Sequence, residues 1–287
     1  MQRTVQHMVS CFGIGVHSGR PTSLSLSPAP INSGITFIRT DITEEGINNK
    51  IHAKYDGVSK VRLGTTIKNC SGIEISTIEH LMAALWGCNI DNVVIEVDGP
   101  EIPAMDGSAE PFVFMIECAG FQIQDAPRKR LKILKEVCVK EEGGAMIKFV
   151  PNDHFCVDMK IQFDTKVIST QEFSFSEREK SFKHEIARAR TFGFKHEEEA
   201  LKSRGFAQGA SLENVIVINN EKILNTDGLR YKDEFVRHKL LDLIGDFYLA
   251  GGPIQGTVRA FKTGHALNNR AIHTLIADSS SYEFVYR

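Results

Sequence analysis

The chain has 287 residues, of which 42% are hydrophobic, enough to bury the core of one large or two ordinary domains. Its 34 lysines and arginines nearly balance its 36 aspartates and glutamates, and the net charge of -2 argues against nucleic acid or an anionic membrane as partner. No apolar run approaches the roughly 18 residues of a membrane span, and residues 1–19 lack the apolar core of an export signal, so we expect neither a membrane span nor export. Six scattered cysteines favour free thiols, so we expect a soluble cytoplasmic protein.

The first half of the chain is predicted to be rich in strands, with two helices among them. Strands are expected at 22–28, 34–41 and 92–99, and helices at 76–87 and 108–120, each helix ending at a glycine. A polar, basic segment that contains a proline follows and is the best candidate for a linker between domains. This linker covers residues 124–130.

The second half mixes strands and helices in a comparable order. A hairpin over 131–151 is predicted to turn at two adjacent glycines, and a long helix is predicted over 234–249. The other predicted elements are a strand at 155–164, helical segments at 184–194 and 197–205, a strand at 256–264 and a last helix at 265–276.

Both halves end in the order helix, glycine, strand, loop, helix. This order predicts an α+β fold built from a duplicated two-layer unit of helices on a sheet. The two domains would cover residues 1–126 and 127–287.

Three polar residues form one row along the helix predicted over 234–249. His238, Asp242 and Asp246 are spaced four apart and therefore lie above one another, on the side opposite the apolar residues. The simpler interpretation is a solvated face, because charge on an exposed helix face is common. Against it, the two carboxylates repel each other unless a cation lies nearby, and a His and an Asp at this spacing can bind one metal ion. The spacing alone leaves both interpretations open.

The helix predicted over 76–87 offers a second pair, Glu79 and His80, in its first turn. A zinc site with an open position for water has three protein ligands, and His80 would supply one of them, with Glu79 beside it as a general base. The simpler interpretation is structural, because Ser76 and Glu79 fit a capping box. If the two halves pack face to face, His80 and His238 converge.

Several common catalytic motifs are missing from the sequence. The glycines of 13–19 are spaced differently from those of a dinucleotide-binding fingerprint. There is no P-loop, no G-x-S-x-G nucleophile elbow and no H-E-x-x-H helix. These absences argue against the corresponding nucleotide-binding, serine-hydrolase and thermolysin-like classes.

Six blocks of sequence carry a family resemblance when they are taken together and in order. They are STIEHLMAAL, DNVVIEVDGPEIPAMDGSAEPFV, RARTFGF, LKSRGFAQGASLENVIV, LRYKDEFVRHKLLDLIGD and AFKTGHALNN. They closely resemble the UDP-3-O-(3-hydroxyacyl)-N-acetylglucosamine deacetylases, zinc amidases at the committed step of lipid A synthesis in Gram-negative bacteria. The resemblance runs from residue 3 to beyond residue 269, and it implies two similar two-layer domains packed face to face, each with a small insert.

The resemblance implies a metal site that joins the two domains. The family's ligands fall on His80 in the first domain and on His238 and Asp242 in the second. The metal implied is Zn²⁺, and Fe²⁺ also fits such nitrogen and oxygen ligands. The remaining ligand position would hold water, whose pKa a bound metal lowers.

The family's catalytic groups fall on four further positions. Glu79 would take the proton of the attacking water, and Thr191 and protonated His265 would help the metal to stabilise the oxyanion. Asp246 would stabilise the imidazolium of His265. The proton for the leaving amine would come from His265 or from Glu79, and the sequence leaves both routes open.

The implied substrate is a UDP-linked, acylated N-acetylglucosamine, and the implied protein is a monomer. Phe192 and Phe194 would line a passage for the acyl chain, built from an insert over about 194–223. Lys239 and Lys262 resemble basic residues near the diphosphate and the sugar.

Two other functions remain as alternatives. One is a zinc amidohydrolase for a different N-acetyl sugar, which would act without an O-linked acyl chain. The other is a protein of the same fold that binds a nucleotide sugar without catalysis. The second would be expected to lack Glu79 or His265, and both residues are present.

Overall fold

The computed structural model describes residues 1–286 as an α+β fold with several sheets and six α-helices. This confirms the mixed fold class predicted from the sequence. No helix in these residues combines the length and the apolar character needed to cross a bilayer. The helices are α1 (Glu79–Gly87), α2 (Glu110–Ala119), α3 (Phe182–Glu185), α4 (Glu198–Lys202), α5 (Glu234–Tyr248) and α6 (His265–Ala277), with short 3-10 helices η1 (Tyr55–Gly57) and η2 (Lys195–Glu197).

The strands form two large sheets and smaller ones. The five-stranded sheet has the order β2 (Val9–Ile14), β3 (Pro21–Pro28), β9 (Val93–Val97), β4 (Ile35–Arg39), β5 (Lys50–His52). The seven-stranded sheet has the order β12 (Val137–Lys140), β13 (Met146–Val150), β19 (Ile254–Phe261), β11 (Lys129–Ile133), β20 (Tyr282–Tyr286), with β14 (Phe155–Gln162) beside β19 and β15 (Thr170–Ser176) beside β14. The smaller sheets are β1 (Gln2–Val5) with β10 (Phe121–Gln124), β6 (Val58–Lys60) with β7 (Thr66–Lys68) and β8 (Glu74–Ile75), and β16 (Phe192–Phe194) with β17 (Ile216–Asn219) and β18 (Lys222–Ile223).

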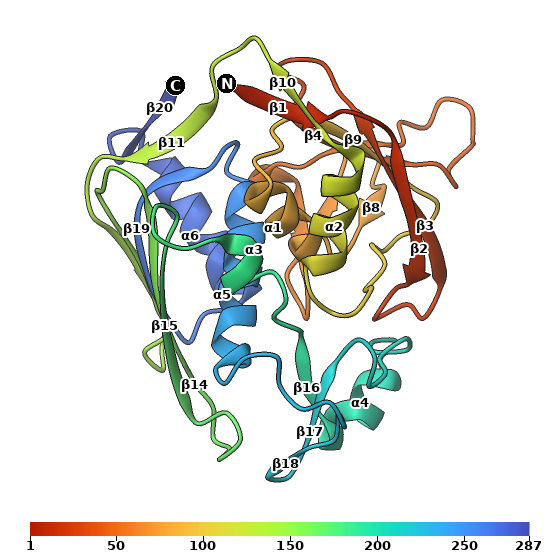
Figure 1. The fold of residues 1–287 in the computed structure, drawn as a ribbon, viewed down its shortest axis with the longest axis vertical. Helices are drawn as coiled ribbons and strands as arrows, with labels where there is room; N and C mark the ends of the chain where they lie inside the picture. The colour runs from red at the N-terminus through yellow and green to blue at the C-terminus, as the bar shows by residue number, and fades with distance from the viewer. Residues whose placement is uncertain (287) are drawn as a thin grey trace.

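The long helices lie between the two large sheets, as Figure 1 shows. Helices α1 and α2 lie on the side of the five-stranded sheet, and α5 and α6 lie on the side of the seven-stranded sheet. Helices α1 and α5 pack against each other in the middle of the molecule, and theirs is the most extensive contact between two elements. The small sheet of β16, β17 and β18 lies apart, below these layers in the view of Figure 1.

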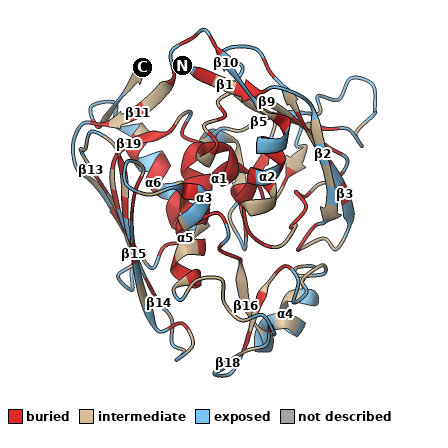
Figure 2. Cartoon of the chain, in the orientation of Figure 1, coloured by how far each residue is buried: buried red, intermediate tan, exposed pale blue. Residues whose placement is uncertain are grey.

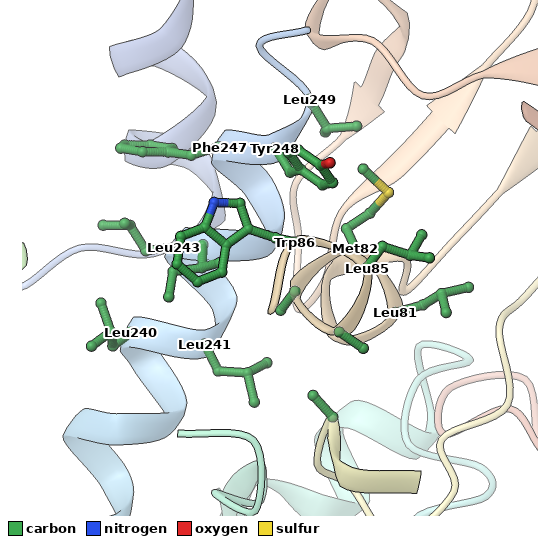
Figure 3. Packing of buried hydrophobic residues seen from close by; sticks show 14 of the residues in the cluster. Leu81, Met82, Leu85, Trp86, Leu240, Leu241, Leu243, Phe247, Tyr248 and Leu249 are labelled. Carbon is green, nitrogen blue, oxygen red and sulfur yellow. The ribbon is translucent and has the colours of Figure 1, made fainter. Parts of the chain in front are cut away.

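Helix α1 is apolar almost all round, and such a helix is stable only when it is covered on every side. Its residues from Glu79 to Trp86 are all buried, and α5 is buried along most of its length as well (Figure 2). Figure 3 shows the large apolar side chains of both helices in one cluster, with Trp86 projecting from α1 toward α5. The apolar residues of α5 therefore account for only part of its burial, because the row of His238, Asp242 and Asp246 is buried as well.

Gly245 allows the backbones of α5 and α1 to come together. A Cβ atom at this position would lie 2.0 Å from the carbonyl oxygen of Glu79, so no larger residue fits without a backbone shift. Gly245 lies between Asp242 and Asp246 along the helix. The close approach therefore fixes the first turn of α1 against the polar row of α5.

Most of the predicted elements are confirmed. The helices expected at 76–87, 108–120, 234–249 and 265–276 appear as α1, α2, α5 and α6. Strands β12 and β13 pair antiparallel around the two expected turn glycines, both at positive φ. The hairpin begins later than the expected 131, because residues 131–133 belong to β11, which pairs with β19 and β20. The segment 124–130 leads from β10 into β11, and its Arg128 forms a 2.7 Å ion pair with Asp91.

The helix expected over 184–194 is wrong. Helix α3 ends at Glu185, and the chain then extends into β16, which pairs with β17. Tertiary bonds override the helical propensity of this run: the backbone N–H and the side chain of Arg190 bond to the buried Glu234, and the N–H of Thr191 donates to Gly107. The result is an extended segment that passes beside α5.

The substitution Gly245→Ala tests whether the helix contact is as close as described. In an ordinary helix interior this change stabilises a protein by roughly 0.5–1 kcal/mol, whereas here the new methyl group meets the backbone of Glu79. We expect the free energy of unfolding to fall by about 1–3 kcal/mol, as for other overpacked cores. Chemical denaturation measures this change, and an unchanged or raised stability would contradict the close approach.

Candidate active site

The predicted site residues meet in one cavity of about 680 Å³. The first turn of α1, the middle of α5, the start of α6 and the segment from Thr191 to Leu224 form its walls. Of the residues predicted from the sequence, all except Asp246 line it: Glu79, His80, Thr191, Phe192, Phe194, His238, Lys239, Asp242, Lys262 and His265.

His80, His238 and Asp242 form a compact group of potential metal ligands. Each contributes one ligand atom, and the three atoms lie within 4.8 Å of one another. All three side chains are buried, so the interpretation of the α5 row as a solvated face is wrong. The partner that covers this row is α1, which contributes His80.

The ring of His238 is oriented for a metal by the main chain. Its Nδ1 bonds to the carbonyl oxygen of Ala189 at 3.0 Å, which fixes the proton on Nδ1 and leaves the lone pair of Nε2 directed at Asp242. Burial lowers the pKa of His238 to about 3. The ring is therefore neutral at physiological pH, the form that ligates metals.

Asp242 has one oxygen free for a cation. Its Oδ2 accepts a 2.8 Å bond from Lys239 Nζ. Its Oδ1 is fully buried and has no hydrogen-bond partner among residues 1–286, while the Nε2 atoms of His238 and His80 lie 3.3 and 3.5 Å away. Burial raises the pKa of Asp242, but the basic side chains around it lower the pKa more, and the net direction is well below the usual value.

A buried carboxylate oxygen without a partner is costly unless something occupies the site with it. Here that oxygen faces two imidazole nitrogens, one of them held neutral. Two nitrogens and one oxygen are a usual donor set for Zn²⁺ or Fe²⁺ with an open position. The side chains present therefore fit a divalent cation.

Glu79 faces the cavity and does not cap its helix. Helix α1 begins at Glu79 without a side-chain cap, and Ser76 Oγ donates instead to the carbonyl of Pro100, so the capping-box interpretation is wrong. Glu79 Oε2 accepts a 2.9 Å bond from the N–H of Thr65, and Oε1 lies 3.8 Å from His265 Nε2. Burial raises the pKa of Glu79, while His265 and His80 oppose this rise. A raised pKa suits a group that accepts and returns a proton.

His265 is the first residue of α6 and is paired with Asp246 of α5. Its Nδ1 lies 2.9 Å from Asp246 Oδ2, which leaves Nε2 directed into the cavity. Burial lowers the pKa of His265, but Asp246 and Glu79 raise it more, to about 9. The ring is therefore protonated at neutral pH, unlike His238, and can donate a proton or stabilise negative charge.

The other predicted residues line the walls of the cavity. Thr191 is held in place by main-chain bonds to Gly107 and Ile216, of 2.9 and 2.8 Å. The ammonium of Lys239, besides its bond to Asp242, lies 5.6 Å from the centre of the Phe192 ring. Lys262 is exposed at the edge and adopts a positive φ of 52°.

The cavity continues between apolar side chains. The segment after β16 supplies most of them, together with Val61 and Leu63 from the first half of the chain. Residues of this segment that line the cavity are Phe194, Leu201, Ala207, Ala210, Leu212, Val215, Val217 and Leu224.

Sequence reasoning missed the residues that support the predicted ones. Thr65 bonds to Glu79 and Asp246, Asn268 bonds to Asp246, and the carbonyl of Ala189 bonds to His238. Asn268 and Ala189 lie in the blocks AFKTGHALNN and RARTFGF but were given no role there, and Thr65 lies outside all six blocks. His17 also lines the cavity, and its glycine-rich segment was considered only for dinucleotide binding. A turn of apolar and small residues gives no signal of such contacts.

Comparison with known proteins identifies the family. The family described as LpxC, UDP-3-O-acyl N-acetylglycosamine deacetylase, matches residues 2–277. The chain belongs to this family. Enzymes named UDP-3-O-acyl-N-acetylglucosamine deacetylase from Shewanella violacea and from Shewanella baltica strain OS155 are each 48% identical to it over 286 residues, which cover 99% of this chain and 92% of the relative.

Membership in the LpxC family confirms the resemblance found in the sequence. The chain is a deacetylase, hence a hydrolase, and its family acts in lipid A biosynthesis. The buried His80, His238 and Asp242 form a metal-binding group within it.

The substitution His238→Ala tests the metal-binding group by a readout that does not need substrate. We expect the variant, dialysed against Zn²⁺ and then against metal-free buffer, to retain far less than one equivalent of zinc by mass spectrometry, because one of three ligands is lost. His7→Ala is the matched control, since His7 is exposed and lies outside the cavity. Equal zinc contents in the two variants would refute His238 as a ligand.

Proposed function

We propose that the chain removes the N-acetyl group of UDP-3-O-(3-hydroxyacyl)-N-acetylglucosamine and releases acetate and UDP-3-O-(3-hydroxyacyl)-glucosamine. One observation carries this proposal. The buried group of His80, His238 and Asp242 opens into the same cavity as Glu79 and His265, whose ionisable atoms lie 3.8 Å apart. The names of the family and of the relatives agree with this substrate.

His80, His238 and Asp242 would hold the cation. Zn²⁺ is the metal we propose, with Fe²⁺ as a second ion that suits the same atoms. When bound, the metal lowers the pKa of water and polarises a carbonyl group. The protein contributes the fixed positions of the ligands, above all the neutral ring of His238 and the free oxygen of Asp242.

Glu79 is proposed as the general base. Its Oε2 is engaged by the N–H of Thr65, so Oε1 is the atom available to the attacking water. Burial raises its pKa, which makes the carboxylate a better proton acceptor than an exposed one. The attack of water on the acetamide carbon would therefore transfer a proton to Glu79 Oε1.

His265 is proposed as the proton donor and, together with Thr191, as a stabiliser of the oxyanion. The imidazolium is charged at neutral pH because Asp246 supports it through Nδ1. Its Nε2 faces the cavity and can donate to the oxygen or to the leaving amine. Of the two routes left open by the sequence, we propose donation by His265, because this ring is charged before the reaction starts, whereas Glu79 gains its proton only from the attacking water.

The apolar part of the cavity is proposed as the passage for the acyl chain. Phe192 and Phe194 begin its wall, and the insert of about 194–223 supplies much of the rest. Each buried methylene contributes about 0.8 kcal/mol, so a long acyl chain would dominate the binding free energy. Lys239 and Lys262, which also line the cavity, would contact the sugar and the diphosphate.

We also propose that the chain consists of two similar domains, 1–126 and 127–287, which arose by duplication and pack face to face. The placement of α1 and α2 on one large sheet and of α5 and α6 on the other supports this division. Glu79 and His80 would come from the first domain, and His238, Asp242 and His265 from the second. One chain supplies every proposed site residue, which favours a monomer, and six free cysteines agree with a cytoplasmic location.

The substitution Glu79→Gln tests the function and the proposed role together. With the UDP-linked acylated substrate, we expect wild-type protein to release acetate, to lose this activity to a chelator and to regain it with Zn²⁺. The variant should bind zinc normally but lose roughly 10²-fold or more in kcat, the range of general-base contributions.

Three results would count against the proposal. If the substrate without its acyl chain were hydrolysed equally well, the enzyme would be a different amidohydrolase. Binding of the substrate without hydrolysis would favour a binding protein. A fully active Glu79→Gln variant with a lowered melting temperature would make Glu79 structural.

A further inference from the structure

Thr65 contacts both sides of the proposed reaction centre. It precedes β7 in the first half of the chain, and its side chain is 2% exposed. Its N–H donates to Glu79 Oε2 at 2.9 Å, and its hydroxyl donates to Asp246 Oδ1 at 2.6 Å. The same hydroxyl oxygen lies 3.3 Å from His265 Nδ1.

The hydroxyl proton of Thr65 has one available acceptor. His265 Nδ1 lies 2.9 Å from Asp246 Oδ2, closer than to Thr65, so the proton on this nitrogen bonds to that oxygen. The Thr65 proton therefore goes to Asp246 Oδ1. The two bonds engage both oxygens of the carboxylate from different parts of the chain, one before α1 and one at the start of α6.

Asn268 completes the environment of Asp246. Its Nδ2 donates to Asp246 Oδ2 at 2.8 Å, and its Oδ1 accepts a bond from the hydroxyl of Thr263. Oδ2 is thus held by two donors within α6, whereas Oδ1 accepts its bond from Thr65. Removal of the Thr65 hydroxyl leaves one oxygen of a buried carboxylate unpaired, and the carboxylate can then rotate.

We propose that Thr65 is a positioning residue that holds the Asp246–His265 pair at a fixed distance from Glu79. The inference rests on the roles proposed above for these three residues. The backbone of Thr65 fixes the base, and its hydroxyl fixes the carboxylate that orients the imidazole, so a single residue sets the 3.8 Å separation of Glu79 Oε1 and His265 Nε2. Thr65 itself does not line the cavity and acts only through its neighbours.

The substitution Thr65→Val removes the hydroxyl and keeps the shape of the side chain. We expect kcat for acetate release from the UDP-linked acylated substrate to fall roughly 10-fold to 100-fold, the range for a lost hydrogen bond to a charged group. KM and zinc content should stay unchanged, because the passage and the ligands are untouched. Thr65→Ser restores the hydroxyl and should recover most of the lost kcat.

Thr66→Val is the matched control. Thr66 is the next residue and is also buried, but the bonds to Glu79, Asp246 and His265 come from Thr65 and not from Thr66. A purely structural role for Thr65 would lower the melting temperature of Thr65→Val and leave the kcat of the folded enzyme near that of the control. That outcome, or a loss confined to KM, would overturn the proposal.

A double-mutant cycle with Asp246→Asn tests whether Thr65 acts through Asp246. We expect Thr65→Val to cost little further kcat once Asp246 has been replaced, and full additivity would contradict the proposal. The cycle also separates this inference from the function on which it rests. If Asp246→Asn lowers kcat and Thr65→Val does not, only the inference fails. If Asp246→Asn and His265→Ala both retain wild-type kcat, the proposed mechanism fails, and the inference fails with it.

Discussion

The close contact between the first turn of α1 and the middle of α5 is the constraint on which the site depends. Gly245 permits it, since any side chain there would meet the carbonyl of Glu79. The contact brings the first turn of α1, with Glu79 and His80, against the polar row of α5, which lies far away along the chain. Apolar burial on the remaining sides of both helices supplies the free energy that maintains it (Figures 2 and 3). The cost of bringing charges together is thus offset by the packing of the core.

Three buried carboxylates, Glu79, Asp242 and Asp246, meet at this contact, and each has a different environment. Asp242 has Lys239 on one oxygen and a free oxygen on the other, which suits a cation. Asp246 has the imidazole of His265. Among residues 1–286, Glu79 accepts a hydrogen bond only from a backbone N–H, and burial raises its pKa. These environments divide the roles of ligand, orienting group and base among chemically similar side chains.

Periodicity and helix signals were sufficient to predict the elements that carry the site. They identified α1, α5 and α6, and they placed His238, Asp242 and Asp246 in one row, but they favoured a solvated face, because the covering helix is distant in sequence. The capping box of Ser76 and Glu79 matched a local pattern that the fold does not use. The helix expected over 184–194 failed because bonds to Glu234 and Gly107 extend the chain there. Family resemblance supplied the remaining site residues, and Thr65 carried no sequence signal at all.

The most direct test of this account is anomalous diffraction at the zinc absorption edge from crystals of the protein supplied with Zn²⁺. The account predicts a strong peak about 2.0–2.2 Å from Nε2 of His80, Nε2 of His238 and Oδ1 of Asp242, within the cavity that Glu79 and His265 share. A catalytically active crystal form with no peak at this position, or with its zinc on other side chains, would contradict it.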